Sequence, residues 1–207
     1  NQIRGLLGEY GLVMQQGVHH LINQLPAILE GHTDKLSDDG KWLFDQAMEQ
    51  LRELIKRIEV IEDKIKAVFV SSEDCQALNQ IKGIGVLTAT ALISAAGNAK
   101  EFKNGRQFSA WLGLVPKQNS SGGKTRLLGI TKQGNSYLRR LLIHGARATL
   151  YWSPRSDTPL SRWLHTLQKR VGTNRAVVAL ANKNARLAWA MLAKGEPFNP
   201  SLAYQAG

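Results

Sequence analysis

A short stretch at residues 118–126 combines the hydroxyl, glycine and basic residues that nucleophilic chemistry needs. Ser120 and Ser121 stand side by side, two glycines follow, and the cations Lys124 and Arg126 come next. A serine in this setting could attack a phosphodiester if a neighbouring cation neutralised the developing charge. A flexible basic loop has the same composition, so these residues alone leave both interpretations open. The spacing differs from that of a nucleotide-binding P-loop.

Residues 78–92 have the pattern of a helix-hairpin-helix, in which a glycine turn joins two apolar helices. Gly83 and Gly85 would let the backbone turn tightly and approach a phosphate closely. The second helix would offer free N–H groups and the positive end of its dipole, and Lys82 would add charge. We therefore expect Lys82, Gly83 and Gly85 to hold a nucleic-acid backbone without reading its sequence. The alternative is an ordinary tight turn between two core helices.

A second glycine turn precedes a basic helix at residues 130–140. Lys132 lies in the turn, and Arg139 and Arg140 lie in the first turns of the expected helix. This arrangement is typical of another phosphate-binding hairpin, and Arg147 can share the helix face of Arg139. The alternative is a charged face that is simply solvated.

The charge of the chain is strongly divided. Residues 1–100 hold 10 Lys and Arg against 13 Asp and Glu, whereas residues 101–207 hold 17 against 3, a net charge of +14. Such a surface repels itself unless a polyanion is near, and nucleic acid is the usual partner. A basic surface kept for solubility, or one that binds an acidic protein, is the alternative.

Other site types are not indicated by the sequence. The five histidines lack partners at metal-ligand spacing, and no paired carboxylates suit a two-metal nuclease. We therefore expect neither a metal nor another cofactor in this chain. No apolar run approaches the roughly 20 residues of a membrane helix, so we expect no membrane partner. The chain begins at Asn1 without a Met, with apolar residues already at helical spacing, and we expect it to start inside a longer protein.

The elements that must position these residues are almost all helical. The apolar periodicity and the capping signals predict helices at 1–14, 17–30, 38–68, 75–81, 86–96, 105–112, 135–151, 160–171 and 174–194. Residues 113–129 are expected to form a loop that can hold a short strand pair. The expected fold is all-α, with a long coiled-coil helix before a compact helical domain that carries helix-hairpin-helix-like elements. We expect a linker and arm at 1–72, a C-terminal domain at 73–195 and a flexible tail at 196–207.

The long helix has a heptad seam of about three and a half repeats. Its apolar positions follow alternating steps of three and four: Phe44, Ala47, Leu51, Leu54, Ile58, Ile61, Ile65 and Val68. A sustained 3.5-residue period favours a coiled coil between subunits, and we expect a dimer or tetramer. The alternative is a long helix that packs within its own chain.

Taken together, these segments resemble the transposases of the IS110 and IS1111 insertion-sequence group, which includes the Piv-type DNA invertases. The matching stretches occur in family order: 81–85, 102–108, 110–116, 120–124, 129–135 and 138–142. They cover roughly residues 75–150, the C-terminal transposase domain of the family. Residues 1–13 resemble the helix that follows the family's N-terminal domain.

The resemblance implies a DNA transposase or recombinase, located in the bacterial cytoplasm at the nucleoid. Family members join an N-terminal RuvC-like domain, whose acidic residues bind a divalent metal such as Mg²⁺, to a C-terminal domain with a serine that links covalently to DNA. The serine-then-glycine pattern falls on Ser121, with the adjacent Ser120 as the second candidate. The acidic domain lies outside this sequence, so we expect the chain to bind DNA or RNA but not to recombine DNA alone.

Three questions stay open at this point. Some family members use a structured guide RNA, and the sequence does not decide whether this one does. The chain could also be a non-enzymatic helix-hairpin-helix module that binds nucleic acid, without any need for a serine. A protein-interaction domain based on the heptad seam is a third hypothesis, which the charge division disfavours.

Overall fold

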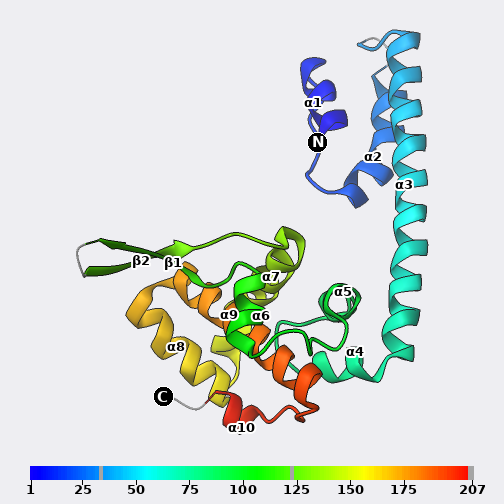
Figure 1. The fold of residues 1–207 in the computed structure, drawn as a ribbon. Helices are drawn as coiled ribbons and strands as arrows, with labels where there is room; N and C mark the ends of the chain where they lie inside the picture. Colours follow the sequence, from blue (N-terminus) through cyan, green and yellow to red (C-terminus); the bar gives the residue numbers. More distant parts are fainter. Residues whose placement is uncertain (33–34, 122–123, 205–207) are drawn as a thin grey trace. The chain divides into compact units, whose positions relative to one another are not determined.

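The computed structural model describes residues 1–32, 35–121 and 124–204, with the side chains of 120, 121, 124 and 125 excepted. The chain divides into two compact units, Asn1–Asp63 and Lys64–Gly207, each with its own apolar core (Figure 1). The division falls inside a helix that the sequence analysis assigned to the arm.

The first unit consists of three helices in chain order, α1 (Gln2–Glu9), α2 (Val18–Gly31) and the first part of α3 (Asp38–Ser71). Apolar side chains of all three form its core, chiefly Leu7, Leu25, Leu29, Phe44 and Met48. Asp38 and Asp39 lie in the first turn of α3, where negative charge stabilises the positive end of the helix dipole.

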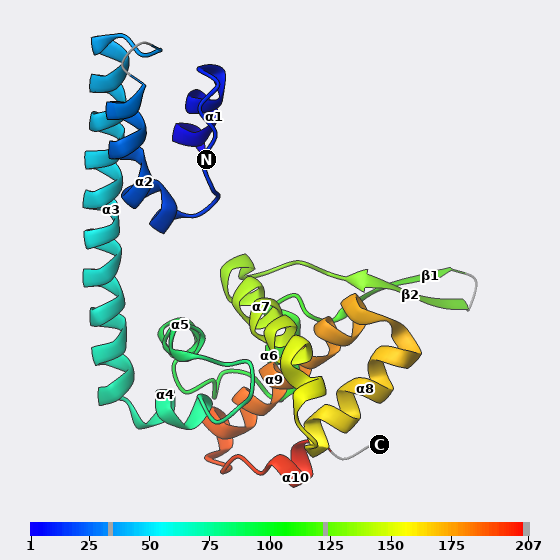
Figure 2. The same cartoon turned by 180° about the vertical axis from the view of Figure 1, so that it is seen from behind.

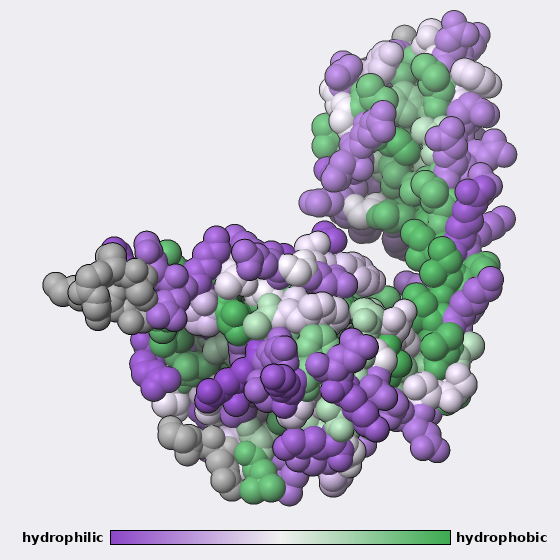
Figure 3. All heavy atoms as spheres, viewed as in Figure 1, coloured by the Kyte–Doolittle hydropathy of each residue, from purple (hydrophilic) through white to green (hydrophobic). Residues whose placement is uncertain are grey.

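The heptad seam of α3 is buried near its start and mostly exposed further along the helix. Phe44 and Met48 are buried within the first unit. Further along, Leu54, Ile58 and Ile61 expose 54%, 54% and 57% of their surfaces. Apolar surface is accordingly visible along the lower part of α3 in Figure 3. The seam is thus buried only at Phe44 and half-buried at Ala47, Leu51 and Ile65. The coiled coil between subunits stays a prediction.

The second unit is a helical domain from which a two-stranded hairpin extends (Figures 1 and 2). Its elements are α4 (Glu73–Leu78), α5 (Val86–Ala96), α6 (Gly105–Trp111), β1 (Pro116–Ser121), β2 (Lys124–Ile130), α7 (Ser136–Trp152), the 3-10 turn η1 (Ser153–Arg155), α8 (Pro159–Val171), α9 (Thr173–Lys194) and α10 (Pro200–Ala203). Helix α9 is central, since it packs against α4, α6, α7 and α8. Its buried face is rich in alanine, including Ala181, Ala185 and Ala188, and small side chains let neighbouring helices approach closely.

The helix boundaries of the second unit follow from local chemistry. The side chains of Ser72, Asn104, Asn135 and Thr158 each accept a hydrogen bond from a backbone N–H in the first turn of the next helix. Gly195 ends α9 in the left-handed conformation that glycine adopts without strain. The predicted all-α class is confirmed, and the one described sheet is the antiparallel pair β1–β2, within the segment where a strand pair had been expected.

The described part of the expected tail packs on the core. Residues 200–204 place Ala203 and Tyr204 among the buried residues, beside Trp163 and Phe198. None of the described helices is long and apolar enough to span a bilayer.

Candidate nucleic-acid interface

The predicted helix-hairpin-helix is formed by α4, the loop 79–85 and α5. Gly83 has a φ of 96°, which favours glycine. A Cβ atom on Gly83 would lie 2.9 Å from Oγ1 of Thr149 and 3.0 Å from the Gly145 carbonyl carbon, so Gly83 is required by packing against α7. The side-chain amide of Asn184 on α9 donates to the Lys82 carbonyl over 2.9 Å and holds the same loop.

Gly85 differs from Gly83 in its surroundings. It precedes the first turn of α5, is exposed, and has no described atom within 4 Å of the place where a Cβ would be. Its backbone φ of −94° is open to any residue. No described side chain caps α5, so N–H groups of its first turn are left for another acceptor. Lys82 is exposed beside this turn. Gly85 and Lys82 therefore have the accessibility that a phosphate contact needs.

The second predicted glycine turn, which precedes α7, is fixed by packing and hydrogen bonds to other parts of the chain. Gly134 has a φ of 82°, and a Cβ there would overlap the Trp111 carbonyl oxygen. Asn135 caps α7 by accepting from two backbone N–H groups. Nη1 of Arg139 donates to the carbonyls of Leu112 and Gln133, both at 3.1 Å. The guanidinium of Arg139 thus ties two loops together, a role that the sequence did not reveal.

The remaining predicted cations of this region are on the surface. Lys132 and Arg140 are exposed, and Arg140 begins a stripe on α7 that continues through His144 and Arg147. These positions, three and four residues apart, share one helix face. The structure therefore separates neighbours that the sequence grouped, since Arg139 is bound to the protein and Arg140 is free to contact a ligand.

The loop and α7 meet at one hollow of about 990 Å³. Lys82, Gly83 and Gly85 line it from the loop, and Leu141 and His144 line it from α7. The structure thus brings the first predicted phosphate-binding element together with His144 of the exposed stripe, whereas Arg140 and Arg147 do not line this hollow. Arg139 does not line this hollow.

The predicted nucleophile lies on the β1–β2 hairpin. Its backbone register pairs Ser121 with Lys124 and Asn119 with Arg126. The side chains of Ser120, Ser121 and Lys124 lie outside what the structure describes, as do Gly122 and Gly123 altogether. Arg126 is exposed.

Two hydrogen bonds fix the base of the hairpin. The N–H of Thr131 donates to Val115, and the side-chain amide of Asn182 on α9 donates to the Leu114 carbonyl over 3.1 Å. Asn182 and Asn184 are positioning residues that sequence patterns missed. Gly145 is a third, and an isolated glycine inside a helical pattern was the signal for it.

A metal site is not formed by the residues that the structure describes. No three of their His, Cys, Asp or Glu side chains gather into a metal-binding group. The described residues therefore offer no such group to the divalent metal that the family resemblance implies.

The chain is similar in sequence to known transposases. Residues 75–160 match the transposase IS116/IS110/IS902 family. The chain is 44% identical, over 198 residues, to the transposase for insertion sequence element IS1111A of Coxiella burnetii, which covers 96% of this chain and 54% of that protein. It is 41% identical over 201 residues to a probable family 20 transposase of Pseudomonas aeruginosa, with 97% and 60% covered. It is 35% identical over 199 residues to the transposase for element IS1328 of Yersinia enterocolitica, with 96% and 59% covered. The chain thus spans somewhat more than half of each relative.

Proposed function

Because this chain belongs to the transposase IS116/IS110/IS902 family, we propose that it is the part of a DNA transposase that holds nucleic acid and carries out strand transfer. It acts together with protein outside these 207 residues, since the match covers only 54% and 60% of the first two relatives. An acidic, metal-binding domain belongs to that other part.

The observation that carries the proposal is the unneutralised charge of residues 101–207. Of its three acidic residues, Asp157 pairs with Arg162 and Glu196 with Lys194. The exposed Arg126, Lys132 and Arg140 have no such partner among the described residues. Together with Lys82 and the open backbone at Gly85, these cations suit the sugar–phosphate chain, which offers negative charge at regular spacing.

Strand transfer is assigned to Ser121. Its Oγ would form a bond to a backbone phosphorus while the bond from that phosphorus to a sugar oxygen breaks, and the leaving oxygen takes up a proton. A sugar hydroxyl of the new strand would then displace the serine, restore the phosphodiester and return the proton to Oγ. The hairpin register supports this assignment, because directly paired residues have Cα atoms about 4.5–5.5 Å apart, which brings Lys124 close to Ser121. Lys124 and Arg126 would stabilise the charge on phosphorus oxygens.

The test is a covalent protein–DNA adduct made by the complete reading frame that encodes this chain. Dye-labelled DNA bearing the element ends is incubated with it, with and without RNA transcribed from the element, and adducts are resolved on a denaturing gel. We expect Ser121→Ala to abolish the adduct and Ser120→Ala, its matched control, to keep it. An adduct retained by Ser121→Ala would move the role to Ser120 or elsewhere. No adduct from the unchanged protein, combined with tight DNA binding, would favour the non-enzymatic module.

A further inference from the structure

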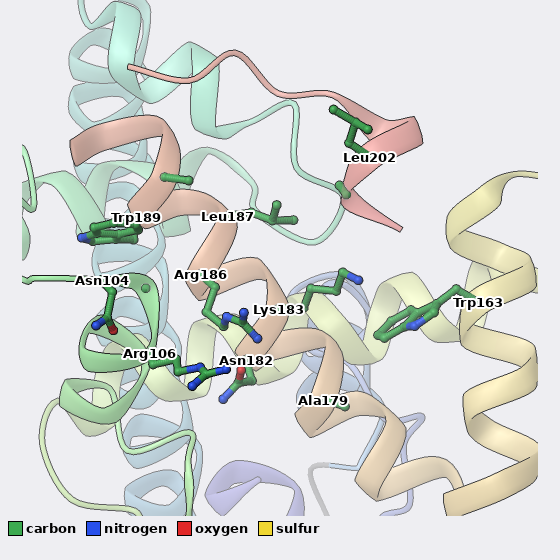
Figure 4. A pocket seen from close by; sticks show the side chains of 13 residues that line it. Asn104, Arg106, Trp163, Ala179, Asn182, Lys183, Arg186, Leu187, Trp189 and Leu202 are labelled. Atoms are coloured by element: carbon green, nitrogen blue, oxygen red, sulfur yellow. The ribbon is translucent and has the colours of Figure 1, made fainter. Parts of the chain in front are cut away.

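A second basic hollow lies away from all the predicted site residues. It is a groove of about 760 Å³ along α9, bordered by α6, α8 and α10 (Figure 4). None of the residues that line it belongs to the loop 79–85, the hairpin or α7. It also shares no lining residue with the hollow beside Gly83 and Gly85.

Three cations from two helices converge on this groove. Arg106 comes from α6, and Lys183 and Arg186 come from α9, with their side chains lying near one another (Figure 4). None of the described lining residues is acidic. Arg106 and Arg186 are exposed, and neither has a hydrogen-bond or ion-pair partner in the described part of the chain. These two guanidinium groups are therefore available to an external anion.

The third cation, Lys183, is fixed at the groove wall, where its charged form is disfavoured. Nζ of Lys183 lies 4.7 Å from the Trp163 ring centroid and 5.6 Å from that of Tyr204, so two aromatic rings fix the ammonium at the groove wall. Burial, and then the charge of Arg186, lower the pKa of Lys183. Like charges held together without a carboxylate destabilise one another, and a bound anion would relieve this repulsion.

The chemistry of the walls indicates which anion fits. Beside the three cations, the half-buried Trp163 and the exposed Leu202 line the groove. A concave basic channel with an aromatic wall is the arrangement that holds a single nucleic-acid strand, in which phosphates meet cations and bases meet flat apolar surface. The bases of a duplex are stacked on one another and are not available to such an aromatic wall.

We propose that this groove binds the phosphodiester backbone of a single nucleic-acid strand, at a site separate from the hairpin and the exposed face of α7. Arg106 and Arg186 contact phosphate oxygens, and Lys183 adds charge from the wall. The inference rests on the proposed function, since it assumes that the chain works on nucleic acid. It adds a second strand-binding site to that function.

The experiment measures binding of the 207-residue chain to short dye-labelled oligonucleotides by fluorescence anisotropy over a series of KCl concentrations. Single-stranded DNA, single-stranded RNA and duplex DNA form its three arms. The variants are Arg106→Gln and Arg186→Gln. Arg175→Gln is the matched control, because Arg175 is an exposed arginine of the same helix α9 that does not line the groove. Arg186→Lys preserves the charge.

We expect each groove variant to weaken single-strand binding about fivefold at 0.1 M salt and to reduce the slope of log K against log[salt] by about 0.7, the value for one lost contact. Arg175→Gln should change neither quantity comparably, and Arg186→Lys should keep most of the slope. The DNA and RNA arms show which strand is preferred.

Four results would overturn the proposal. Groove variants that behave like Arg175→Gln would show that only general charge matters. Groove variants that weaken duplex binding alone would refute the single-strand assignment. If Arg140→Gln weakens binding and the groove variants do not, the groove inference fails while the proposed function stands. If the unchanged chain shows no salt-dependent binding in any arm, both fail.

Discussion

The carbonyl group of Gly83 lies directly against Gly145 of α7, so that a Cβ atom on Gly145 would overlap the Gly83 oxygen. The two glycines make a backbone-to-backbone contact between the turn of the helical hairpin and the middle of α7. This contact places the hairpin turn beside His144, the middle residue of the exposed stripe on α7.

Gly145→Ala tests this contact. Alanine favours a helix over glycine by about 1 kcal/mol, so α7 alone would gain stability. The overlap with Gly83 should outweigh that gain, and we expect a net loss of about 2 kcal/mol in the free energy of unfolding, measured by urea denaturation. The matched comparison is Gly85→Ala, whose Cβ would enter open space. It should cost less than about 1 kcal/mol and weaken DNA binding instead. Equal stability losses for the two variants would contradict the assigned roles.

Arg139 and Arg140 are adjacent residues with different roles. Arg139→Gln should remove the two charged hydrogen bonds to the Leu112 and Gln133 carbonyls and cost about 2 kcal/mol of stability. Arg140→Gln removes an exposed charge and should leave the unfolding free energy within about 0.5 kcal/mol. It should instead reduce the salt slope of duplex binding by about 0.9. Thermal melts and fluorescence anisotropy on both variants check these two expectations. A loss of stability in Arg140→Gln, together with an unchanged stability in Arg139→Gln, would refute them.

The exposed seam of α3 predicts association through a second copy of the chain. Ile61 is a seam residue and Val60 is not, yet each exposes 57% of its surface. Ile61→Asp should raise the dissociation constant of the oligomer more than about a hundredfold, because an unpaired charge in an apolar seam costs several kcal/mol. Val60→Asp should have little effect. Light scattering after size exclusion gives the masses. A monomeric unchanged chain, or equal effects of the two variants, would rule out the coiled coil.

Tyr204 should make stability depend on alkaline pH. Burial raises the pKa of Tyr204 to about 12, from 10.0 for a free tyrosine. Below pH 10 both the folded and the unfolded chain keep the proton, so the hydroxyl causes no pH dependence there. Between pH 10 and 12 only the unfolded chain releases it, which destabilises the fold by up to about 2 kcal/mol.

Tyr204→Phe should remove this contribution. At pH 8 the variant should be as stable as the unchanged chain or slightly more so, because the buried hydroxyl has no hydrogen-bond partner among the described atoms. Urea denaturation at pH 8 and pH 11 gives the comparison. Identical losses of stability in both proteins on going to pH 11 would contradict the role of Tyr204.

Local signals were enough to predict most of the described helices, but α1 ends at Glu9, short of the predicted residue 14, and α10 was not predicted. Asn104 and Asn135 cap helices where the sequence placed helix starts, and the apolar periodicity of α3 extends over the predicted length. These features depend on neighbours within a few residues, which a sequence displays directly. The strand pair β1–β2 was harder to predict from the sequence, because glycine and serine residues are typical of loops as well as of hairpins.

Contacts between segments that are distant in the sequence could not be predicted from such local signals. A glycine that packs against another helix and a glycine that lies open to solvent look alike in sequence, so Gly83 and Gly85 could not be told apart. The partners of Arg139 lie as far as 27 residues away in the chain. The groove cations come from α6 and α9, and only the packing of these helices brings Arg106 to Arg186.

The most direct test of the account is the salt dependence of duplex DNA binding by the 207-residue chain. If Lys82, Lys124, Arg126, Lys132 and Arg140 contact phosphates, log K should fall with log[KCl] with a slope of about −4.5, because each contact contributes about −0.9. Reversing the charges of Lys132 and Arg140 should abolish most of the binding at 0.1 M salt. A slope near zero, or binding that survives those reversals unchanged, would contradict the claim that this chain holds the nucleic-acid backbone.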